Sequence, residues 1–496
     1  MHKAIAVPLF ILSTCAAAAA PDGAGPPPFV SYPILIRVGE AGAEHGHFVM
    51  GPGESLVPGP LVRGPGAGTA AAPSSTGVGL TAGANINVSN ANGSYQGETT
   101  AVSNGLHLVG GSNSIFPGNC SASAAPGAFG DCAPRAYVSD NGSTWTSTSL
   151  PRTWNGTTFG IGFDPAIDVD KSGMFYYTYG VAPLGGSYPN AIVMVKSTDG
   201  MHWTQTTPVT FNRNRFFDDK YYVAIDRSGS PFANRIYVAW DRNQANNQIL
   251  YVASSSNFGV SWTAPVKVND GTSSFERVIG AYPAVDHNTG VVYVSWHDYA
   301  KNIIFIDKST DGGATWGKDV AAATTHAGFG QDIGCVGGRE QGPAHAIKVG
   351  PSGAIYLAYA DPIQNRGFDV LFKKSTNGGA TWSAPVRLND DSGAADQFHP
   401  TLAVTGGTNG DVVTVSFYDR RDDPANCLAH VYATRSIDSG ATWSANVKAT
   451  TSASDFDGNP NGPGDYSSSS AHGSVVYPLF SDHRNADFEI YTAPLQ

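Results

Sequence analysis

Hydrophobic and polar positions along this chain recur in one repeated unit. Each unit has an apolar segment, a glycine-containing turn and a second segment rich in Tyr, Val and Trp, which is the pattern of two adjacent β-strands. Seven such units follow one another, at residues 98–110, 165–179, 222–240, 283–296, 343–359, 400–418 and 466–480. The repetition predicts an all-β protein assembled from tandem sheets.

A short phrase, Ser-x-Asp-x-Gly-x-Thr-Trp or a near variant, follows six of these units. The copies at 309–316, 375–382 and 436–443 are the best, and those at 140–145, 197–203 and 255–262 are weaker. Successive tryptophans of the phrase lie 54 to 66 residues apart, at Trp145, Trp203, Trp262, Trp316, Trp382 and Trp443. A period of about 60 residues suits one four-stranded propeller blade per repeat.

The phrase has the chemistry of a hairpin turn. Asp or Asn accepts hydrogen bonds from the turn backbone, Gly takes the positive-φ position, and Trp packs between neighbouring sheets. These residues match the Asp box of the bacterial neuraminidase repeat, and from about Asn85 to the end the chain resembles the sialidase-like β-propellers. The resemblance implies a fold more than an activity, because Asp boxes also occur in lectins, sorting receptors and other glycosidases.

The last unit has only about three strands and needs a fourth. Residues 85–89, which precede the first unit, could supply it and so remove the free sheet edges. We therefore predict a seven-bladed β-propeller of four-stranded antiparallel blades over residues 85–496, with six blades as the alternative. A signal peptide at 1–20 and a flexible, disordered leader rich in Pro, Gly and Ala at 21–84 are expected to precede it.

The composition agrees with a turn-rich β protein and restricts its partners. The chain has 59 Gly, 32 Pro, 11% aromatic and only 14% charged residues, which excludes both a helical bundle and wholesale disorder. A net charge of −11 disfavours nucleic acid. We expect a secreted or periplasmic monomer, with a lipoprotein anchored at Cys15 as the less favoured alternative, no membrane span, and an extracellular glycan or glycoprotein as partner.

The remaining cysteines are expected to form disulfides in an oxidising compartment. Cys120 and Cys132 flank a loop of Gly, Ala and Ser, and we predict that they close it. Cys335 and Cys427 are too far apart in sequence for a pairing to be assigned from the sequence.

One acidic segment is a weak candidate for a structural Ca²⁺ site, and no other cofactor is expected. Asp455, Asp457 and Asn459 alternate with residues that include Gly and Pro and could surround the ion with oxygen ligands. A solvated turn explains the same residues more simply.

Polar side chains are expected to converge at one mouth of the propeller channel, where the loops that enter each inner strand and leave each second strand meet. The predicted substrate-binding residues there are Trp240, Asp241, Arg242, His297, Asp298, His399, Arg420, Arg421 and Arg484. The arginines would clamp an anion, since a guanidinium grips a carboxylate bidentately. The simpler alternative is that each Asp–Arg pair is a salt bridge that locks its own loop.

The segment Asp-Tyr-Ser-Ser at 465–468, with the segments 473–480 and 488–491, resembles the last blade of sialidases. This resemblance implies that Tyr466 is the nucleophile, and Glu340 is the candidate for its activating base. Asp164, at another inner-strand start, completes the predicted catalytic set. The sequence lacks the Arg-Ile-Pro of the sialidase first blade, and two of the three clamp arginines have no counterpart.

We expect a sialidase-like glycoside hydrolase that acts on acidic glycans containing sialic acid or uronate. One alternative is a polysaccharide lyase, in which arginines and histidines at the mouth would neutralise a uronate and abstract its α-proton. The other is a non-catalytic propeller that binds glycans or proteins, with Trp240 and Trp296 as stacking platforms.

Overall fold

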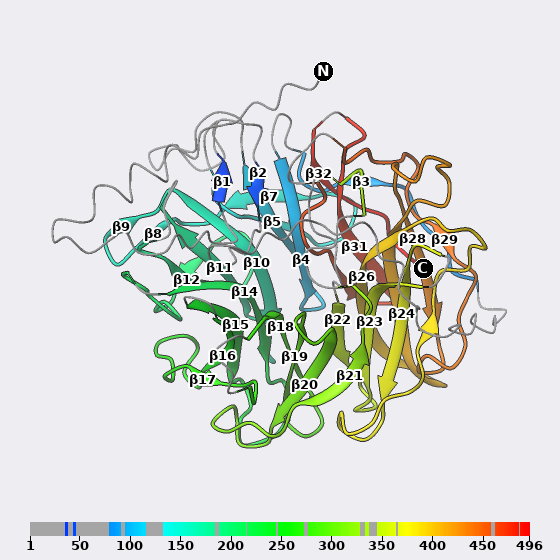
Figure 1. Ribbon diagram of the computed structural model, residues 1–496. Helices are drawn as coiled ribbons and strands as arrows, with labels where there is room; N and C mark the ends of the chain where they lie inside the picture. The colour runs from blue at the N-terminus through cyan, green and yellow to red at the C-terminus, as the bar shows by residue number, and fades with distance from the viewer. Residues whose placement is uncertain are drawn as a thin grey trace, which may run out of the picture.

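Seven four-stranded antiparallel sheets form a ring around a central channel, so the protein is a seven-bladed β-propeller (Figure 1). This confirms the predicted fold, and the six-bladed alternative is wrong. The computed structural model describes the backbone of β1 (Leu35–Arg37) and β2 (Ala43–His45), which pair with each other, and residues 79–90, 95–115, 132–183, 188–214, 216–244, 247–271, 276–327, 333–336, 345–363, 366–457, 462–485 and 487–496.

In blades 1 to 6 the four strands follow chain order from the channel outward. Blade 1 comprises β4 (Tyr95–Ser103), β5 (Leu108–Ile115), β6 (Arg135–Ser139) and β7 (Thr146–Ser149). Blade 2 comprises β10 (Ile161–Val169), β11 (Phe175–Ala182), β12 (Ala191–Ser197) and β13 (Thr204–Gln205). Blade 3 comprises β14 (Phe217–Ile225), β15 (Ile236–Gln244), β16 (Asn247–Ser255) and β17 (Val266–Lys267). A small hairpin of β8 (Thr153–Trp154) and β9 (Thr157–Thr158) lies between blades 1 and 2 in sequence.

Blades 4 to 6 repeat the same order. Blade 4 comprises β18 (Val278–Val285), β19 (Val292–Asp298), β20 (Ile303–Ser309) and β21 (Val320–Thr324). Blade 5 comprises β22 (His345–Val349), β23 (Ile355–Pro362), β24 (Phe368–Ser375) and β25 (Val386–Arg387). Blade 6 comprises β26 (Gln397–Gly407), β27 (Gly410–Asp419), β28 (His430–Ser436) and β29 (Val447–Lys448).

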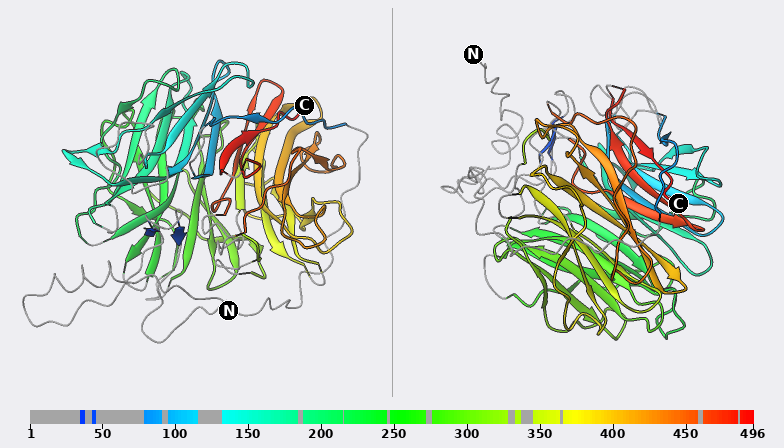
Figure 2. Two further views of the ribbon diagram at one scale, coloured as in Figure 1. Left: turned by 90° about the horizontal axis from the view of Figure 1, so that it is seen from above. Right: turned by 90° about the vertical axis from the view of Figure 1, so that its right-hand side faces the viewer.

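Blade 7 closes the ring with strands from both ends of the propeller. Its inner three strands are β30 (Ser468–His472), β31 (Val475–Asp482) and β32 (Glu489–Thr492), and its outer strand is β3 (Ile86–Asn87). The blue β3 therefore lies beside the red C-terminal strands, both from above and from the side (Figure 2). This is the closure that the sequence predicts, and it leaves no blade without an outer strand.

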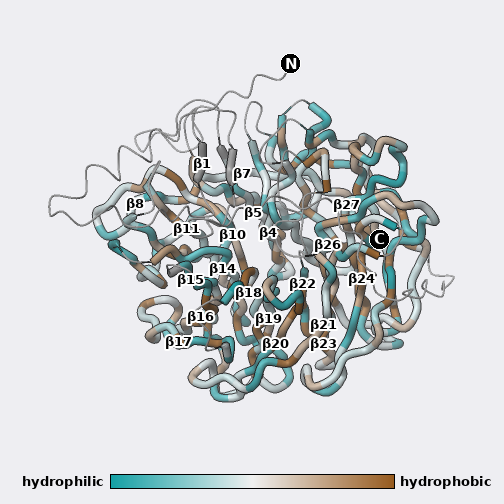
Figure 3. The backbone as a smooth tube through the Cα atoms, viewed as in Figure 1, coloured by the Kyte–Doolittle hydropathy of each residue, from teal (hydrophilic) through white to brown (hydrophobic). Residues whose placement is uncertain are grey.

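The apolar cores lie between neighbouring blades, which is why hydrophobic residues follow the strands while polar residues gather in the loops (Figure 3). Trp443 of the phrase at 436–443 is buried in the core between blades 5 and 6, with its ring centroid 4.9 Å from that of Phe372. The turn is held by Ser436 and Asp438, whose side chains accept hydrogen bonds from Gly440 N and Thr442 N at 2.8 and 2.9 Å. Gly440 has a φ of 75° and touches Phe372, so a side chain would not fit there.

Reciprocal hydrogen bonds clasp the outer edges of adjacent blades. Between blades 3 and 4, Asp270 N donates to Asp319 Oδ2 at 3.0 Å and Asp319 N donates to Asp270 Oδ2 at 3.1 Å. Between blades 5 and 6, Asp390 N donates to Asn446 Oδ1 at 3.0 Å and Asn446 N donates to Asp390 Oδ2 at 2.9 Å. At the closure, Thr451 N donates to Asn85 Oδ1 at 2.8 Å. The clasp therefore recurs with either Asp or Asn as one member.

Replacing Asn85 by Ala is expected to weaken the ring closure. Its side chain donates to Ala449 O at 2.6 Å and accepts from Thr451 N and from Arg484 Nη2 at 2.9 Å, so the substitution removes hydrogen bonds that join the first strand of the propeller to blades 6 and 7. We expect Asn85→Ala to lower the free energy of unfolding by about 1–3 kcal/mol in urea titrations. Leu106→Ala, at a 73% exposed position, is the control and should change it by less than about 0.5 kcal/mol. Equal effects of the two substitutions would contradict this account of the closure.

The Asp270–Asp319 clasp should make stability depend on pH. Burial raises the pKa of Asp319 to about 7, and the nearby Asp270 also raises it. A carboxyl with a raised pKa is protonated in the folded state, so its contribution is complete at low pH and is lost as pH rises through 7. We expect Asp319→Asn to remove about 1 kcal/mol of the decline between pH 5 and pH 8, a value reduced for partial solvent exposure. Urea midpoints at both pH values measure this, and Asp457→Asn at an exposed position should leave the decline unchanged.

Candidate functional site

The upper mouth of the channel, defined as the end where the inner strands begin, contains one backbone feature repeated in five blades. The pairing of the inner strand with the second strand shifts at the same place in each of them. The shifted residues have positive φ angles, of 56° at Glu98, 51° at Asp164, 45° at Lys220, 71° at Gly280 and 48° at His399. Four of the five are not glycine, and backbone strain of this kind persists where the surroundings require it and is common at functional sites.

Three of these bulges bring a lysine and carboxylates from different blades together. Lys220 Nζ lies 2.5 Å from Asp465 Oδ2, 3.6 Å from Asp164 Oδ2 and 3.7 Å from Glu98 Oε1. The Lys220 side chain is only 7% exposed and that of Asp465 11%. Burial acts to lower the pKa of Lys220, but Asp164, Asp465 and Glu98 raise it well above its usual range. The lysine therefore stays charged, and a charged ammonium favours the ionised form of the carboxyl groups beside it.

Two further carboxyl groups of this cluster favour the protonated form. Asp219 and Asp241 are opposite each other on β14 and β15, and both are fully buried. Burial raises the pKa of Asp219, with Lys220 opposing the shift, and burial raises the pKa of Asp241 well above its usual range, with Asp219 adding to it. Asp164 lies close enough to Asp219 to affect its pKa. Ionisation of both carboxyl groups of such a buried pair is unfavourable, which favours one proton shared by the pair.

A layer of tyrosines follows the carboxylate cluster along the inner strands. The hydroxyls of Tyr222 and Tyr282 are 2.8 Å apart and their stacked rings 3.9 Å apart, while Tyr466 meets Tyr222 edge-on at 5.4 Å. Tyr466 donates to Pro165 O at 3.3 Å. Burial raises the pKa of Tyr466 well above its usual range, and Asp164 and Glu98 raise it further. The predicted nucleophile thus lies in the cluster as a neutral phenol.

The four predicted clamp arginines are each bonded to carboxylates of the chain itself. The closest atoms are 2.6 Å apart for Arg242 and Asp218, 2.7 Å for Arg421 and Asp419, 2.7 Å for Arg484 and Asp482, and 3.5 Å for Arg420 and Asp396. This is the loop-locking salt bridge of the simpler alternative, and it occupies the donors that a ligand carboxylate would need.

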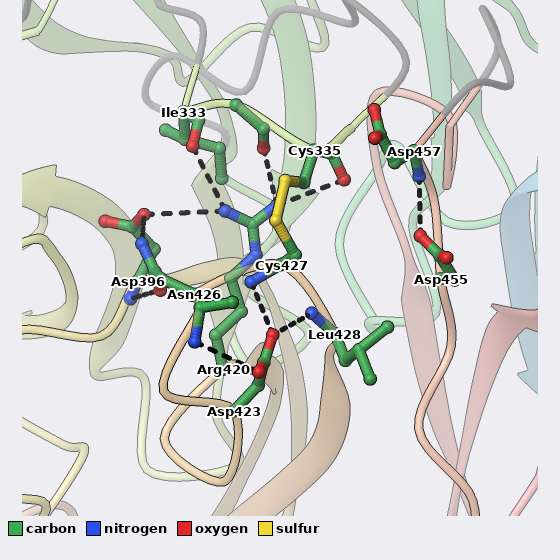
Figure 4. Close-up of a disulfide and its surroundings, with 12 residues drawn as sticks. Ile333, Cys335, Asp396, Arg420, Asp423, Asn426, Cys427, Leu428, Asp455 and Asp457 are labelled. Carbon is green, nitrogen blue, oxygen red and sulfur yellow. Dashed lines mark hydrogen bonds and ion pairs between the residues drawn. A yellow bond between two sulfur atoms is a disulfide. The ribbon is translucent and has the colours of Figure 1, made fainter.

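Arg420 also supports the loops around the disulfide between Cys335 and Cys427 (Figure 4). This disulfide joins the loop before β22 to the loop between β27 and β28, two segments 92 residues apart. The buried guanidinium of Arg420 donates to Gly334 O at 2.7 Å and to Ile333 O at 3.1 Å. The pairing that the sequence left unassigned therefore braces the rim between blades 5 and 6.

The other predicted binding residues are placed apart from the cluster or inside the protein. Trp240 and Trp296 are fully buried between blades and offer no face to a sugar, which corrects their expected role as platforms. His297 bonds Thr325 Oγ1 at 3.1 Å, and burial together with His345 lowers its pKa to about 3. Asp298 pairs with Lys301 at 2.5 Å. A neutral His297 cannot neutralise a uronate, so the lyase alternative loses support at this position.

The structure tests only some of the remaining predicted residues, because others lie outside the part of the chain that it describes. His399, at the blade 6 bulge, is buried edge-on to Tyr418 at 5.9 Å. Asp457 N donates to Asp455 Oδ1 at 3.0 Å, as in a simple turn, and no group of three or more metal-ligating side chains occurs among the described residues. Glu340, Asn459 and Cys120, and with it the predicted link to Cys132, lie outside the described residues. The part of the chain that is described has no helix able to cross a membrane.

Comparison with known proteins gives distant structural similarity alone. No family model and no curated protein sequence matches the chain. A protein of unknown function from Dyadobacter fermentans matches at 12% identity and a TM-score of 0.48, over 84% of this chain and 99% of that chain. A Hadza microbial sialidase matches at 16% identity and a TM-score of 0.45, over 73% of this chain and 68% of that chain. A polysaccharide lyase described as an ulvan lyase matches at 11% identity and a TM-score of 0.48, over 82% of this chain and 95% of that chain. These values assign no family and no activity.

Sequence reasoning missed the central role of Lys220 and Asp465. Lys220 follows two aspartates at an inner-strand start, and a lysine among carboxylates in a chain with so few charged residues is the signal that could have found it. Its partners could not be chosen without the bulges, because these decide which side chains turn into the channel.

Removal of the Lys220 charge should destabilise the protein in a pH-dependent manner. We expect Lys220→Met to lower the free energy of unfolding by about 3–5 kcal/mol at pH 7, since it leaves buried carboxylates without their cation. The loss should shrink at pH 5, because the carboxylates can then take up protons. Urea unfolding at both pH values measures it. Lys301→Met removes an ion pair whose lysine is 57% exposed and should cost less than about 1 kcal/mol. A loss that is the same at both pH values would contradict the assignment.

Proposed function

We propose that the protein is a glycoside hydrolase whose catalytic groups are the carboxyls at the upper mouth. The Asp164–Asp219 pair supplies the proton for the leaving oxygen, and Asp465, held ionised by Lys220 at 2.5 Å, is the carboxylate of the reaction. Glycoside hydrolysis requires one protonated and one ionised carboxyl at the scissile bond. The observation that carries the proposal is that one buried cluster places Asp465, paired with Lys220, beside carboxyls whose pKa is raised by burial.

The electrostatics of the cluster favour an uncharged sugar over the acidic glycan expected from the sequence. The clamp arginines already bind carboxylates of the chain, and the one cation placed in the cluster, Lys220, is surrounded by Glu98, Asp164 and Asp465. A sugar carboxylate beside these groups would be repelled, whereas sugar hydroxyls can donate to them.

Asp465 is better suited than Tyr466 to act as the nucleophile or base. A tyrosine nucleophile is useful where the anomeric centre carries a carboxylate, which an uncharged sugar lacks. The pKa of Tyr466 is raised by burial and by Asp164 and Glu98, so the phenol is hard to ionise. We assign Tyr466 to the wall beneath the catalytic carboxyls.

The location proposed for this activity is outside the cytoplasm. The Cys335–Cys427 disulfide is consistent with an oxidising compartment, as is the apolar N-terminal segment followed by small residues. Glycans exposed at cell surfaces or in the medium are the substrates available there.

Turnover of fluorogenic glycosides with purified variants tests the proposal. We expect hydrolysis of an uncharged glycoside that falls at least about 100-fold in kcat/KM in Asp219→Asn and in Asp465→Asn, since each removes one of the two required carboxyls. Tyr466→Phe should retain activity within about tenfold. Asp390→Asn, which removes a rim partner of Arg421, is the matched control and should remain active. Thermal unfolding of each variant verifies that it is folded.

Three outcomes would contradict the proposal. Binding of glycans without product would favour the non-catalytic propeller. Turnover of sialosides that is lost in Tyr466→Phe and kept in Asp465→Asn would restore the sialidase-like mechanism. Loss of activity in Asp390→Asn equal to that in Asp219→Asn would assign the effect to loop structure.

A further inference from the structure

The opposite end of the channel, the lower mouth where the inner strands end, contains a cavity of about 690 Å³. Its wall is mixed in character, and its apolar part includes Val102, Val223, Pro283 and Val285 from the inner strands of three blades and Pro351 from the turn after β22. A volume of this size accommodates a small organic ligand, and an apolar wall with a few placed polar groups is typical of ligand sites.

The charged groups of this cavity come from four adjacent blades. Arg227, at the end of β14, reaches across to Asp168 of β10, with Nη1 2.8 Å from Oδ1. On its other side Arg227 Nη2 donates to His287 Nε2, beyond the end of β18, at 2.7 Å. The side chain of Lys348 of β22 lines the same cavity, enclosed by the channel but open to the solvent within it. The inner strands of blades 2 to 5 thus deliver their charges to one place.

The carboxylates that line the cavity are already satisfied. Asp168 accepts from Arg227 and, through Oδ2, from Ile225 N at 2.8 Å. Asp170 accepts from Ser172 Oγ at 2.6 Å and from Tyr176 OH at 3.1 Å. Both carboxylates therefore already have hydrogen-bond or ion-pair partners within the protein.

The cations are not balanced in the same way. Lys348 makes no hydrogen bond or ion pair with a described residue, and Arg227 Nε has no acceptor among them. Burial in the channel lowers the pKa of Lys348, Asp168 raises it and Arg227 lowers it, which places the ammonium within electrostatic range of both. Burial and Arg227 lower the pKa of His287 to about 4, so it is neutral at pH 7.

Charge counting over the residues that line the cavity gives an excess of one cation, while Asp226 and Asp286 in the adjoining turns act electrostatically on His287. Lys171, Arg227 and Lys348 contribute three positive charges against two from Asp168 and Asp170, a balance of +1 on a chain whose net charge is −11. Because no described side chain pairs with the Lys348 ammonium, it remains available to the anionic group of a ligand.

We propose that the lower mouth binds a small organic anion. The ammonium of Lys348 and the free edge of the Arg227 guanidinium hold its carboxylate or phosphate group, and the valines and prolines contact its apolar part. The site is separate from the upper mouth, because the tyrosine layer of Tyr222, Tyr282 and Tyr466 lies between the two ends of the inner strands.

Isothermal titration calorimetry with benzoate, phenyl phosphate and uncharged benzyl alcohol tests the proposal. We expect at least one anion to bind at millimolar concentration or tighter and benzyl alcohol to bind at least about tenfold more weakly. Comparison of the two anions decides whether the site takes a carboxylate or a phosphate. Lys348→Met should weaken anion binding by about tenfold or more and remain folded, since the substitution removes an unpaired charge.

Two control variants make the result specific. Lys318→Met removes an exposed lysine outside the cavity and should leave anion binding unchanged. Asp219→Asn alters the upper mouth and should also leave it unchanged, so the outcome is independent of the glycosidase proposal. Equal affinity for benzyl alcohol, no binding of either anion, or unchanged anion binding in Lys348→Met would each overturn the proposal.

Discussion

Closure of the ring by the pairing of β3 with β32 is the constraint on which the rest of the structure depends. It joins the first described segment of the propeller to the last strand and fixes seven sheets around one axis. With the ring closed, inner strands that are hundreds of residues apart share a channel. Lys220 can meet Glu98 and Asp465 because blades 1, 3 and 7 are held at fixed positions around it.

The β-bulges at the starts of the inner strands bring the charged side chains of different blades together. An inner strand with regular pairing would continue its alternation past the mouth, whereas the positive φ at Glu98, Asp164 and Lys220 turns these side chains toward the axis. The cost of left-handed backbone at three non-glycine residues is offset by their ion pairs. The same cluster separates protonation states, since burial favours the neutral form of Asp219 and Asp241 while Lys220 favours the charged form of its partners.

The sequence was sufficient for the fold and insufficient for the site, for physical reasons. Blade number and the closing strand follow from repeats, since each copy of the phrase carries its own turn residues, as Ser436, Asp438 and Gly440 do. Side-chain partners do not repeat in that way. Arg242 is bonded to Asp218, its register partner across β14 and β15, and Arg421 is bonded to Asp419 two residues before it. The sequence allowed both pairs but could not decide them.

The sequence did not reveal the lower mouth, because the candidate residues come from the loops at the starts of the inner strands and not from the loops at their ends. Lys348 and Arg227 lie at or just after those ends. Their proximity follows from the ring arrangement of the blades, which places both in the wall of one cavity. The two mouths differ in character: the upper one is rich in carboxyls and the lower one has an excess of cations. One propeller channel therefore offers two chemically distinct environments, separated by tyrosines.

Neutron diffraction from crystals of the deuterated protein grown at pH 7 tests the central claim most directly, because it locates the protons in the carboxyl cluster. The account predicts one deuteron between the carboxyls of Asp164 and Asp219, a fully deuterated Lys220 ammonium, and none on Asp465. An Asp164–Asp219 pair without a deuteron, or a deuteron on Asp465, would contradict it.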